Sequence, residues 1–203
     1  MPNIGIALAT YNGSCYLEKQ LDSIFNQTHK DLCVYAVDDC SDDKTVEILH
    51  SYSKTYPLKY TINDKNLGHV KSFAKAMKMS KGQFIALSDQ DDIWEVNKLE
   101  RLLLAIKDFS VVHSDAYVID AEDTIIADSW TAFYGKKKKS HIDDLLNIQN
   151  CVTGCTVMMT ADFVKDLLPV PDGIPYHDWW VALMAQRHGG VTYCPEKLIC
   201  HRQ

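Results

Sequence analysis

The chain has no apolar run long enough to cross a membrane. A spanning helix needs about 20 consecutive apolar residues, and the apolar run at residues 4–9 is far shorter. No basic segment precedes that run, so it does not have the pattern of a secretory signal peptide either. The sequence therefore predicts a protein that neither spans a membrane nor carries a signal peptide.

Paired cysteines are also missing. The seven cysteines are scattered, and none of them forms a Cys-x-x-Cys pair. An odd and scattered set is typical of a reducing compartment rather than of a disulfide framework. Cys151 and Cys155 have a spacing that could place two metal ligands on one helix face, but no second pair completes a zinc site. We therefore expect a cytoplasmic protein.

Basic residues are fewer than acidic residues. The chain has 21 Lys and Arg against 27 Asp and Glu, giving a formal net charge of −6, which argues against a nucleic-acid partner. With 203 residues, 46% of them hydrophobic, the chain can bury one core. We expect a single domain over residues 1–203.

Strand and helix patterns alternate in the first half. The expected strands are residues 3–10, 32–37, 58–62 and 84–88, and the expected helices are 17–25, 45–52, 70–77 and 96–106. Four such alternations predict an α/β fold, with a mostly parallel sheet covered by helices on both faces.

The second half is less regular. We expect strands at residues 110–119, 151–160 and 191–193, and a helix that begins at His177 and ends before Gly189-Gly190. Gly154 inside the second of these strands indicates a close approach by another part of the chain. Residues 129–143 are expected to be a loop carrying Lys136 to Lys139. That lysine run is either a solvated loop or a contact for anionic lipid heads or a phosphorylated acceptor.

The acidic stretch after the fourth strand carries the strongest chemical signal. Asp89, Asp91 and Asp92 fall within four positions, and such crowded carboxylates repel one another. A divalent ion such as Mg²⁺ or Mn²⁺, bridging to a phosphate-bearing ligand, would relieve that repulsion. The alternative is an acidic loop that caps the following helix. Tyr11-Asn12 and Asp38-Asp39 also follow strands, and the carboxyl ends of parallel strands share one edge, so the three clusters should converge.

Four motifs follow one another in the sequence. They are Ala9-Thr10-Tyr11-Asn12 with Leu17, Leu21, Ser23 and Gln27-Thr28; Val37-Asp38-Asp39 with Ser41 and Asp43; Asn66-Leu67-Gly68; and Ser88-Asp89-Gln90-Asp91-Asp92-Ile93-Trp94, which contains a D-x-D signature. In this order they resemble the motifs of the family-2 glycosyltransferases of GT-A fold, and the last is similar to that of rhamnosyl- and galactosyltransferase-like members. The resemblance covers the whole chain. It implies a Rossmann-like nucleotide-binding half at residues 1–108 and an acceptor-binding half at residues 109–203.

The resemblance also implies roles for individual residues. Thr10 and Tyr11 match positions that line the nucleobase, Asp39 matches the acceptor of a pyrimidine N3–H, and Asp89 resembles the acid near the ribose. Asp91 resembles the metal ligand, and Asp178 matches the general base, although His177 stands where the family usually has Glu. The expected donor-binding set is Ala9, Thr10, Tyr11, Asn12, Asp38, Asp39, Gly68, Asp89 and Gln90.

The last residues depart from the pattern of the family. Relatives often continue with Arg-Gln-His, whose histidine can be a further metal ligand, whereas this chain stops at Gln203. We therefore expect a truncated chain, and His201 becomes the substitute ligand.

The implied activity is metal-dependent, inverting transfer of a sugar from a UDP- or dTDP-sugar to a saccharide or lipid-linked acceptor. The implied setting is cell-surface polysaccharide synthesis, with possible association at the inner face of the membrane. A nucleotidyltransferase would need a glycine-rich, basic phosphate loop after the first strand, and Asn12-Gly13-Ser14 has no lysine. The remaining alternative is an inactive sugar-nucleotide-binding module, against which the intact Asp91 and Asp178 argue.

Overall fold

The computed structural model describes residues 2–136 and 150–203, and within these ranges the chain forms a nine-stranded sheet. The strand order is β3-β2-β1-β4-β8-β6-β9-β5, and β7 pairs with β6. The strands are β1 (Ile4–Thr10), β2 (Leu32–Asp38), β3 (Leu58–Ile62), β4 (Phe84–Ser88), β5 (Ile93–Trp94), β6 (Val111–Ile119), β7 (Ile125–Ala127), β8 (Val157–Thr160) and β9 (Val191–Arg202).

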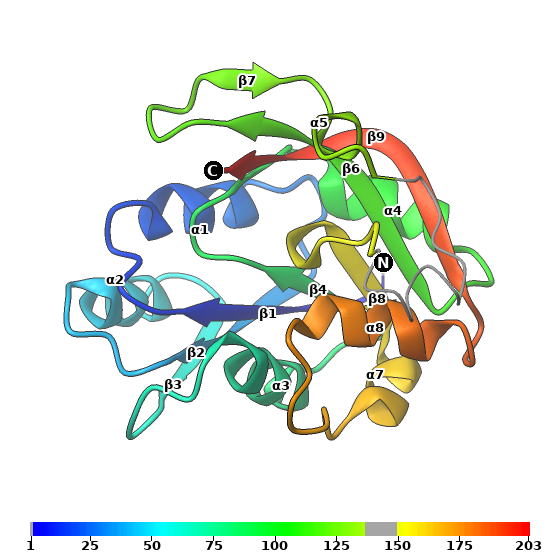
Figure 1. Cartoon of the computed structure of the whole chain (residues 1–203). Helices are drawn as coiled ribbons and strands as arrows, with labels where there is room; N and C mark the ends of the chain where they lie inside the picture. Colours follow the sequence, from blue (N-terminus) through cyan, green and yellow to red (C-terminus); the bar gives the residue numbers. More distant parts are fainter. Residues whose placement is uncertain (1, 137–149) are drawn as a thin grey trace.

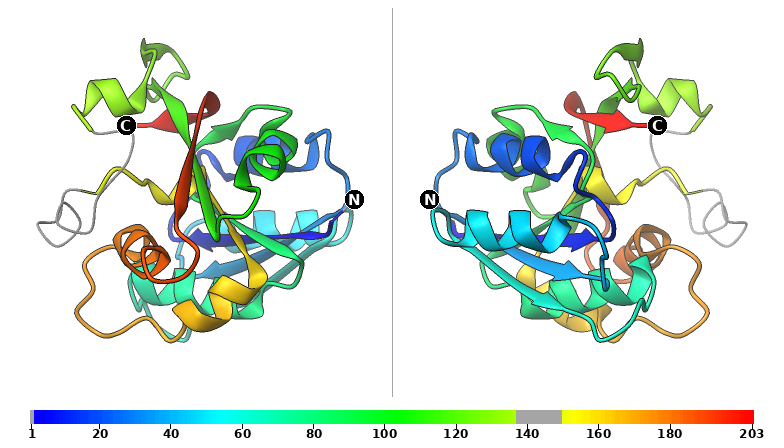
Figure 2. Two further views of the ribbon diagram at one scale, coloured as in Figure 1. Left: turned by 90° about the vertical axis from the view of Figure 1, so that its right-hand side faces the viewer. Right: turned by 90° about the vertical axis from the view of Figure 1, so that its left-hand side faces the viewer.

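Helices cover both faces of this sheet, as the sequence predicts (Figure 1). They are α1 (Leu17–Phe25), α2 (Thr45–Ser53), α3 (His69–Met79), α4 (Lys98–Ile106), α5 (Trp130–Phe133), α7 (Ala161–Leu167) and α8 (His177–Ala185). The side views show α1 and α4 on one face and α3, α7 and α8 on the other (Figure 2). None of the helices in the described ranges is long and apolar enough to cross a membrane.

Alternation along β1 explains the two layers. Ile4, Ile6 and Leu8 are fully buried in the core beneath α1 and α4, whereas Ala7 packs into the second core, beneath α3. Successive side chains of a strand point to opposite faces, so an apolar strand of this length must be covered on both sides. The sequence pattern therefore sets the layer architecture.

The sheet is parallel in its first part and mixed beyond it. Strands β3, β2, β1 and β4 are parallel neighbours, β8 is antiparallel to both β4 and β6, and β9 runs parallel to β6. The parallel order brings the carboxyl ends of β1, β2 and β4 to one edge. This edge positions the three polar clusters that the sequence singles out.

Several expected elements of the second half need correction. The strand expected at 151–160 is only β8, preceded by a 3₁₀ turn at Gly154–Thr156, and part of the loop expected at 129–143 forms α5. Ser129 starts α5, because its hydroxyl accepts a hydrogen bond from the Ala132 N–H at 3.1 Å. Residues 137–149, with most of the lysine run, lie outside the described residues.

Two elements beside the acidic stretch also differ. The helix expected at 96–106 begins two residues later, at Lys98, and the two-residue strand β5 precedes it. The last strand continues to Arg202 rather than ending at Tyr193. Polar residues and register shifts against β6 obscure the period-two pattern of this strand, which explains why the sequence shows only its beginning.

The long β9 strand returns the end of the described chain to the acidic stretch. Ile93 and Trp94 pair antiparallel with Cys200 and Ile199. The buried Arg202 side chain then donates from Nε to the carbonyl of Asp91 at 2.8 Å and contacts the ring of Tyr16. Residues about one hundred positions apart in the sequence are therefore neighbours in the fold.

Candidate active site

A cleft of about 440 Å³ lies at the edge where β1, β2 and β4 end. Its walls come from the loops after these strands, the turn before α3, the first turns of α3, and β9. The lining residues are Ala9, Thr10, Tyr11, Asp39, Asn66, Gly68, His69, Ser72, Phe73, Asp89, Gln90, Asp91 and His201. Among the residues expected from the sequence, Asn12, Asp38 and Asp178 are outside this lining. His69, Ser72 and Phe73 are additions, contributed by α3.

Gln90 fixes the loop after β1. Its Oε1 accepts from the backbone N–H of Tyr11 at 2.8 Å, and its Nε2 donates to the Tyr11 carbonyl at 3.0 Å. A Cβ atom at Gly13 would overlap the Gln90 amide, so the glycine makes room for this clamp. Tyr11 is 48% exposed, so its ring can stack against a planar ligand. Gln90 thus acts on the cleft by holding Tyr11.

Asp38 and Asn12 hold loops together instead of lining the cleft. The fully buried Asp38 carboxylate accepts from the Thr10 hydroxyl at 2.9 Å and from both the N–H and the hydroxyl of Ser41. Asn12 accepts from the Asp42 N–H at 3.0 Å, and its own N–H donates to Ser41. These bonds tie the loop after β1 to the loop after β2.

Asp39 organises the turn before α3. Its carboxylate accepts from the backbone N–H groups of Leu67 and Gly68 and from the Asn63 side chain, each at 2.8 Å. Burial alone would raise the pKa of Asp39, but these hydrogen bonds outweigh it and hold the pKa below its ordinary value. Gly68 has φ +84°, and a Cβ atom there would meet nothing within 4 Å, so backbone conformation rather than space is what requires glycine. Asp39 therefore presents an ionised carboxylate at the floor of the cleft.

The three acids after β4 point in different directions. Asp89 and Asp91 line the cleft, whereas the Asp92 side chain is fully buried behind it. Asp92 Oδ1 lies 3.0 Å from His201 Nδ1 and accepts from the Arg202 N–H at 3.1 Å. Its Oδ2 has no hydrogen-bond partner among the described residues. Asp92 orients His201, and within the described ranges no hydrogen bond occupies His201 Nε2.

The charges around this cluster favour a cation. Burial raises the pKa of Asp89 to about 8, and the charges of Asp92 and Asp91 add to the shift. Burial and the charge of Asp92 likewise raise the pKa of Asp91. Two cleft carboxylates with an oriented imidazole beside them are oxygen and nitrogen ligands that suit Mg²⁺ or Mn²⁺. Together with the unpartnered Oδ2 of Asp92, they fit a divalent cation.

Cys155 lies beside this cluster. Its Sγ lies 3.6 Å from His201 Nδ1, and ligand atoms of Asp92, Cys155 and His201 lie within 4.8 Å of one another. Burial raises the pKa of the Cys155 thiol well above its ordinary value, so the thiol stays protonated.

Lys98 is a buried cation that the sequence analysis does not single out. Its ammonium donates to the Cys155 carbonyl at 2.5 Å and lies 3.6 Å from the centre of the Trp94 ring. Burial lowers the pKa of Lys98 to about 7, against the charges of Asp92 and Asp89, which favour the ammonium form. Lys98 therefore interacts electrostatically with Asp92 and Asp89, although it does not line the cleft.

Asp178 lies in the first turn of α8 but does not cap it. The residue that caps α8 is Tyr176, which makes no side-chain cap bond. Asp178 Oδ2 accepts from the Gly154 N–H at 3.1 Å, and Oδ1 accepts from Asn150 at 3.3 Å. The Asp178 charge also raises the pKa of Asp89, which places this carboxylate within electrostatic reach of the cleft.

The environment of Asp178 makes it basic for a carboxylate. Burial raises its pKa to about 6, although hydrogen bonds from Trp179, Gly154 and Asn150 and the charge of Lys136 favour the ionised form. A carboxylate with a pKa near 6 is better matched to accepting a proton at neutral pH than an exposed aspartate is.

His177 replaces the expected glutamate with a neutral packing group. Its ring stacks on Phe73 with centroids 3.9 Å apart, and both ring nitrogens lack partners among the described residues. Burial, aided by the charge of His69, lowers the pKa of His177 to about 3. A Cβ atom at Gly154 would lie 2.5 Å from His177 Nε2, which confirms the close approach expected at this glycine.

This contact predicts the effect of a methyl group at position 154. Gly154→Ala should destabilise the protein by about 1–3 kcal/mol, because the added atom overlaps a buried ring that is stacked on Phe73. Chemical denaturation of Gly154→Ala, His177→Ala and the double variant measures the coupling. The two changes should be clearly non-additive, with the second relieving part of the first. Simple additivity would contradict the contact.

Comparison with known proteins adds three findings. The profile described as Glycosyl transferase family 2 matches residues 6–167. A putative teichuronic acid biosynthesis glycosyltransferase, TuaG of Bacillus subtilis, is 29% identical over 160 residues, covering 78% of this chain and 62% of TuaG. Among solved structures, S. aureus TarS 1–349 in complex with UDP-GlcNAc superposes with a TM-score of 0.78 at 18% identity, covering 99% of this chain and 58% of that one.

A second solved structure shares the fold. The mannosyltransferase PcManGT from Pyrobaculum calidifontis, in complex with GDP-Man and Mn²⁺, has a TM-score of 0.72 at 18% identity, covering 96% of this chain and 55% of that one. At such identities the structural likeness shows the fold alone, and it confirms the expected GT-A architecture. The chain spans less than two thirds of the length of each of these three proteins.

Proposed function

Because the chain belongs to glycosyl transferase family 2, we propose that its cleft binds a nucleotide-sugar and that the chain transfers the sugar to an acceptor hydroxyl. The observation that carries this proposal is the convergence of Tyr11, Asp39, the Asp89–Asp91 acids and His201 on one cleft, with Asp178 within electrostatic reach. The cleft thus provides an aromatic and acidic end for a nucleoside and an acidic, imidazole-bearing end for a diphosphate.

The donor is a UDP- or dTDP-sugar in this proposal. Asp39 stays ionised and lies at the floor of the cleft, so it is an acceptor for the N3–H of uracil or thymine. Tyr11 stacks on the same base, and Asp89 hydrogen-bonds the ribose. TarS, whose structure contains UDP-GlcNAc, supports a uridine donor, whereas the GDP-Man in PcManGT shows that a likeness of fold alone does not select the base.

Asp91 and His201 would hold a divalent cation, with Asp89 beside them. Mn²⁺ or Mg²⁺ bound there would neutralise the charge that develops on the departing diphosphate. The Mn²⁺ in PcManGT supports this assignment. Asp92 positions His201 through the 3.0 Å contact with Nδ1, so that Nε2 is the nitrogen left for the ion.

Asp178 is the general base in this mechanism. Its carboxylate takes the proton of the acceptor hydroxyl while that oxygen forms a bond to the anomeric carbon of the sugar. The bond from this carbon to the diphosphate breaks, and the diphosphate leaves with the electron pair, so the configuration at the anomeric carbon inverts. Gly154 and Asn150 hold Asp178 in place by their hydrogen bonds. The acceptor in this proposal is a saccharide or a lipid-linked saccharide in cell-surface polysaccharide synthesis. The name of TuaG, a putative teichuronic acid biosynthesis glycosyltransferase, supports a role in polysaccharide synthesis.

The proposed base predicts both a mutational and a pH effect. Asp178→Asn should lower the transfer rate by about 10²–10⁴ and leave UDP binding unchanged, because the variant keeps the shape but cannot take a proton. In the wild type, Asp178 works only when ionised, and its pKa is raised to about 6. The rate should therefore be flat above about pH 7 and fall as the pH drops through 6.

Release of nucleoside diphosphate from a panel of UDP- and dTDP-sugars measures this rate. Asp64→Asn, at an exposed aspartate outside the cleft lining, is the matched control and should behave as the wild type. A variant at position 178 that keeps more than about a tenth of the rate would show that the base lies elsewhere. UDP binding without any release in the wild type would favour the alternative of an inactive binding module.

The metal assignment predicts a change in nucleotide affinity that does not depend on turnover. Asp91→Asn removes one charge and keeps the side-chain shape, so UDP affinity in the presence of Mn²⁺ should fall at least about tenfold. Affinity measured with a chelator should be equal in the variant and the wild type. Calorimetry of both proteins, with Asp64→Asn as control, measures these affinities. If Mn²⁺ increased UDP affinity by the same factor in all three proteins, Asp91 would not be a metal ligand.

The role of Asp39 predicts a preference among pyrimidines. UDP and dTDP should bind about tenfold to a hundredfold more tightly than CDP, whose N3 is an acceptor and would leave two acceptors facing each other. Calorimetry with the three nucleotides on the wild-type protein avoids disturbing the Asn66–Gly68 turn. Equal affinities would show that Asp39 serves only to hold that turn.

A further inference from the structure

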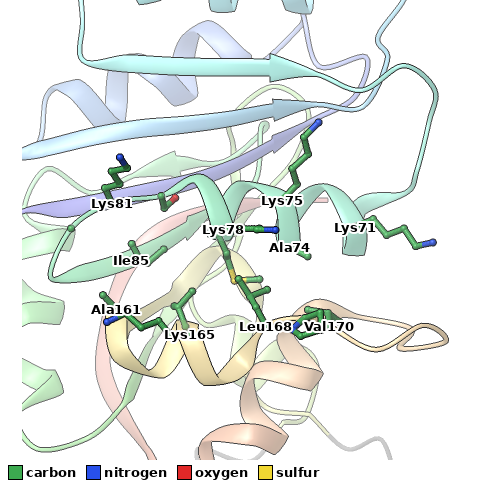
Figure 3. A pocket seen from close by; sticks show the side chains of 15 residues that line it. Lys71, Ala74, Lys75, Lys78, Lys81, Ile85, Ala161, Lys165, Leu168 and Val170 are labelled. Carbon is green, nitrogen blue, oxygen red and sulfur yellow. The ribbon is translucent and has the colours of Figure 1, made fainter.

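A second, larger cavity lies between α3 and α7, with no lining residue in common with the cleft. This groove has a volume of about 1080 Å³ (Figure 3). Its apolar lining comes from α3, β4, α7 and the segment after α7. The apolar residues are Ala74, Met77, Ile85, Ala161, Val164, Leu168, Pro169 and Val170.

The rim of the groove is basic. Five lysines and no Asp or Glu belong to the lining, in a chain whose formal net charge is −6. The lysines lie on both sides of the groove, four along α3 and the turn after it and one on α7 (Figure 3). They are Lys71, Lys75, Lys78, Lys81 and Lys165. The ammonium group of Lys75 points away from the groove and donates to Asn63 Oδ1 at 2.7 Å (Figure 3).

Nearby carboxylates neutralise only part of this charge. Asp172 lies 3.3 Å from Lys71, and Asp162 lies 2.7 Å from Lys165, but both pairs are solvent-exposed and therefore weak. The ammonium groups of Lys78 and Lys81 form no ion pair within the described part of the chain. An apolar lining with an unneutralised cationic rim matches a ligand that is both apolar and anionic.

The shape favours one lipid molecule over a bilayer surface. Membrane-docking faces insert protruding apolar side chains, whereas none of the large exposed hydrophobic residues of the described chain lines this groove. The volume is that of a pocket for a ligand of moderate size, in which apolar walls supply most of the contact and a few charges fix the orientation.

The groove connects to the cleft. A smaller hollow of about 300 Å³ shares Lys71, Ala74 and Val170 with the groove, and shares Gly68 and His69 with the cleft. The ring of His69 lies 6.0 Å from that of Tyr176, two residues before Asp178. A depression therefore runs from the groove, along the first turn of α3, to the proposed active site.

We propose that this groove binds the hydrocarbon chain of a phosphate-bearing lipid acceptor. The hydrocarbon chain lies on the apolar lining, and the phosphate is held by Lys78 and Lys81. The group to be glycosylated reaches the cleft through the hollow at Lys71. This assignment rests on the proposed transferase function for its biological role. The binding site itself rests on the groove alone.

The test is direct binding of dodecyl phosphate, below its micelle concentration, to the full chain by calorimetry. Dodecyl maltoside and inorganic phosphate supply the apolar and the anionic part separately, and each should bind at least about tenfold more weakly. Lys78→Glu with Lys81→Glu should weaken dodecyl phosphate binding at least about tenfold. Ala74→Trp should do the same by filling the groove. Lys54→Glu, at an exposed lysine just after α2 and outside the groove lining, is the matched control and should have no effect.

Every variant is also titrated with UDP and Mn²⁺, which should bind as to the wild type. Binding of UDP but not of dodecyl phosphate would overturn the groove proposal and leave the donor site standing. Binding of dodecyl phosphate but not of UDP would overturn the donor site alone.

Three further results point to other occupants of the groove. Binding of inorganic phosphate as tight as that of dodecyl phosphate would show that the groove is only an anion site. Sedimentation with anionic phosphatidylglycerol vesicles that the glutamate variants lose and Ala74→Trp keeps would show a membrane-facing surface instead. A self-association that Ala74→Trp abolishes would show that a second copy fills the groove. Each of these three results would overturn the proposal.

Discussion

The buried carboxylate of Asp92 is the interaction on which the rest of the site depends. It contacts His201 Nδ1 at 3.0 Å and accepts from the Arg202 N–H, so it joins the loop after β4 to the end of β9. A buried carboxylate is costly unless it is paired and hydrogen-bonded. The two contacts to Oδ1 therefore hold the end of β9 against this loop. They keep His201 beside Asp89 and Asp91, with which it lines the cleft.

The first half of the fold could be predicted from the sequence because its signals are local. Each of the first four strands is a short apolar run bounded by turn residues, and α1 and α3 have one apolar face, so the elements and the sheet type follow without knowledge of distant contacts. The position of the cleft follows as well, since parallel strands place their carboxyl ends at one edge. Thr10, Tyr11, Asp39, Asp89 and Asp91 therefore lie together as predicted.

The second half could not be predicted in the same detail because its elements depend on contacts between distant residues. The course of β9 depends on pairing with β6 and β5 rather than on its own pattern. In the sequence, Asp92 cannot be distinguished from the other acids of its loop. Its partners His201 and Arg202 are more than one hundred residues away. Lys98 looks like a polar position at the start of a helix, yet its stem is buried and its ammonium faces a carbonyl and an indole ring. In each case the decisive partner is too distant for sequence periodicity to reveal.

The surroundings of position 177, which come from distant parts of the sequence, explain why a histidine is tolerated where the family usually has an acid. The structure buries position 177 against Phe73 and beside Gly154, with Asp178 next to it and Asp89 within reach of the charge of Asp178. A second carboxylate at position 177 would be desolvated and would raise the pKa of Asp178 further by like-charge repulsion. A neutral imidazole avoids that added repulsion and fills the space that Gly154 leaves. With His177 neutral, burial and its own hydrogen bonds set the pKa of Asp178 near 6, where a carboxylate is still ionised at neutral pH. The departure at position 177 is therefore compatible with the proposed base at position 178, whose pKa burial raises.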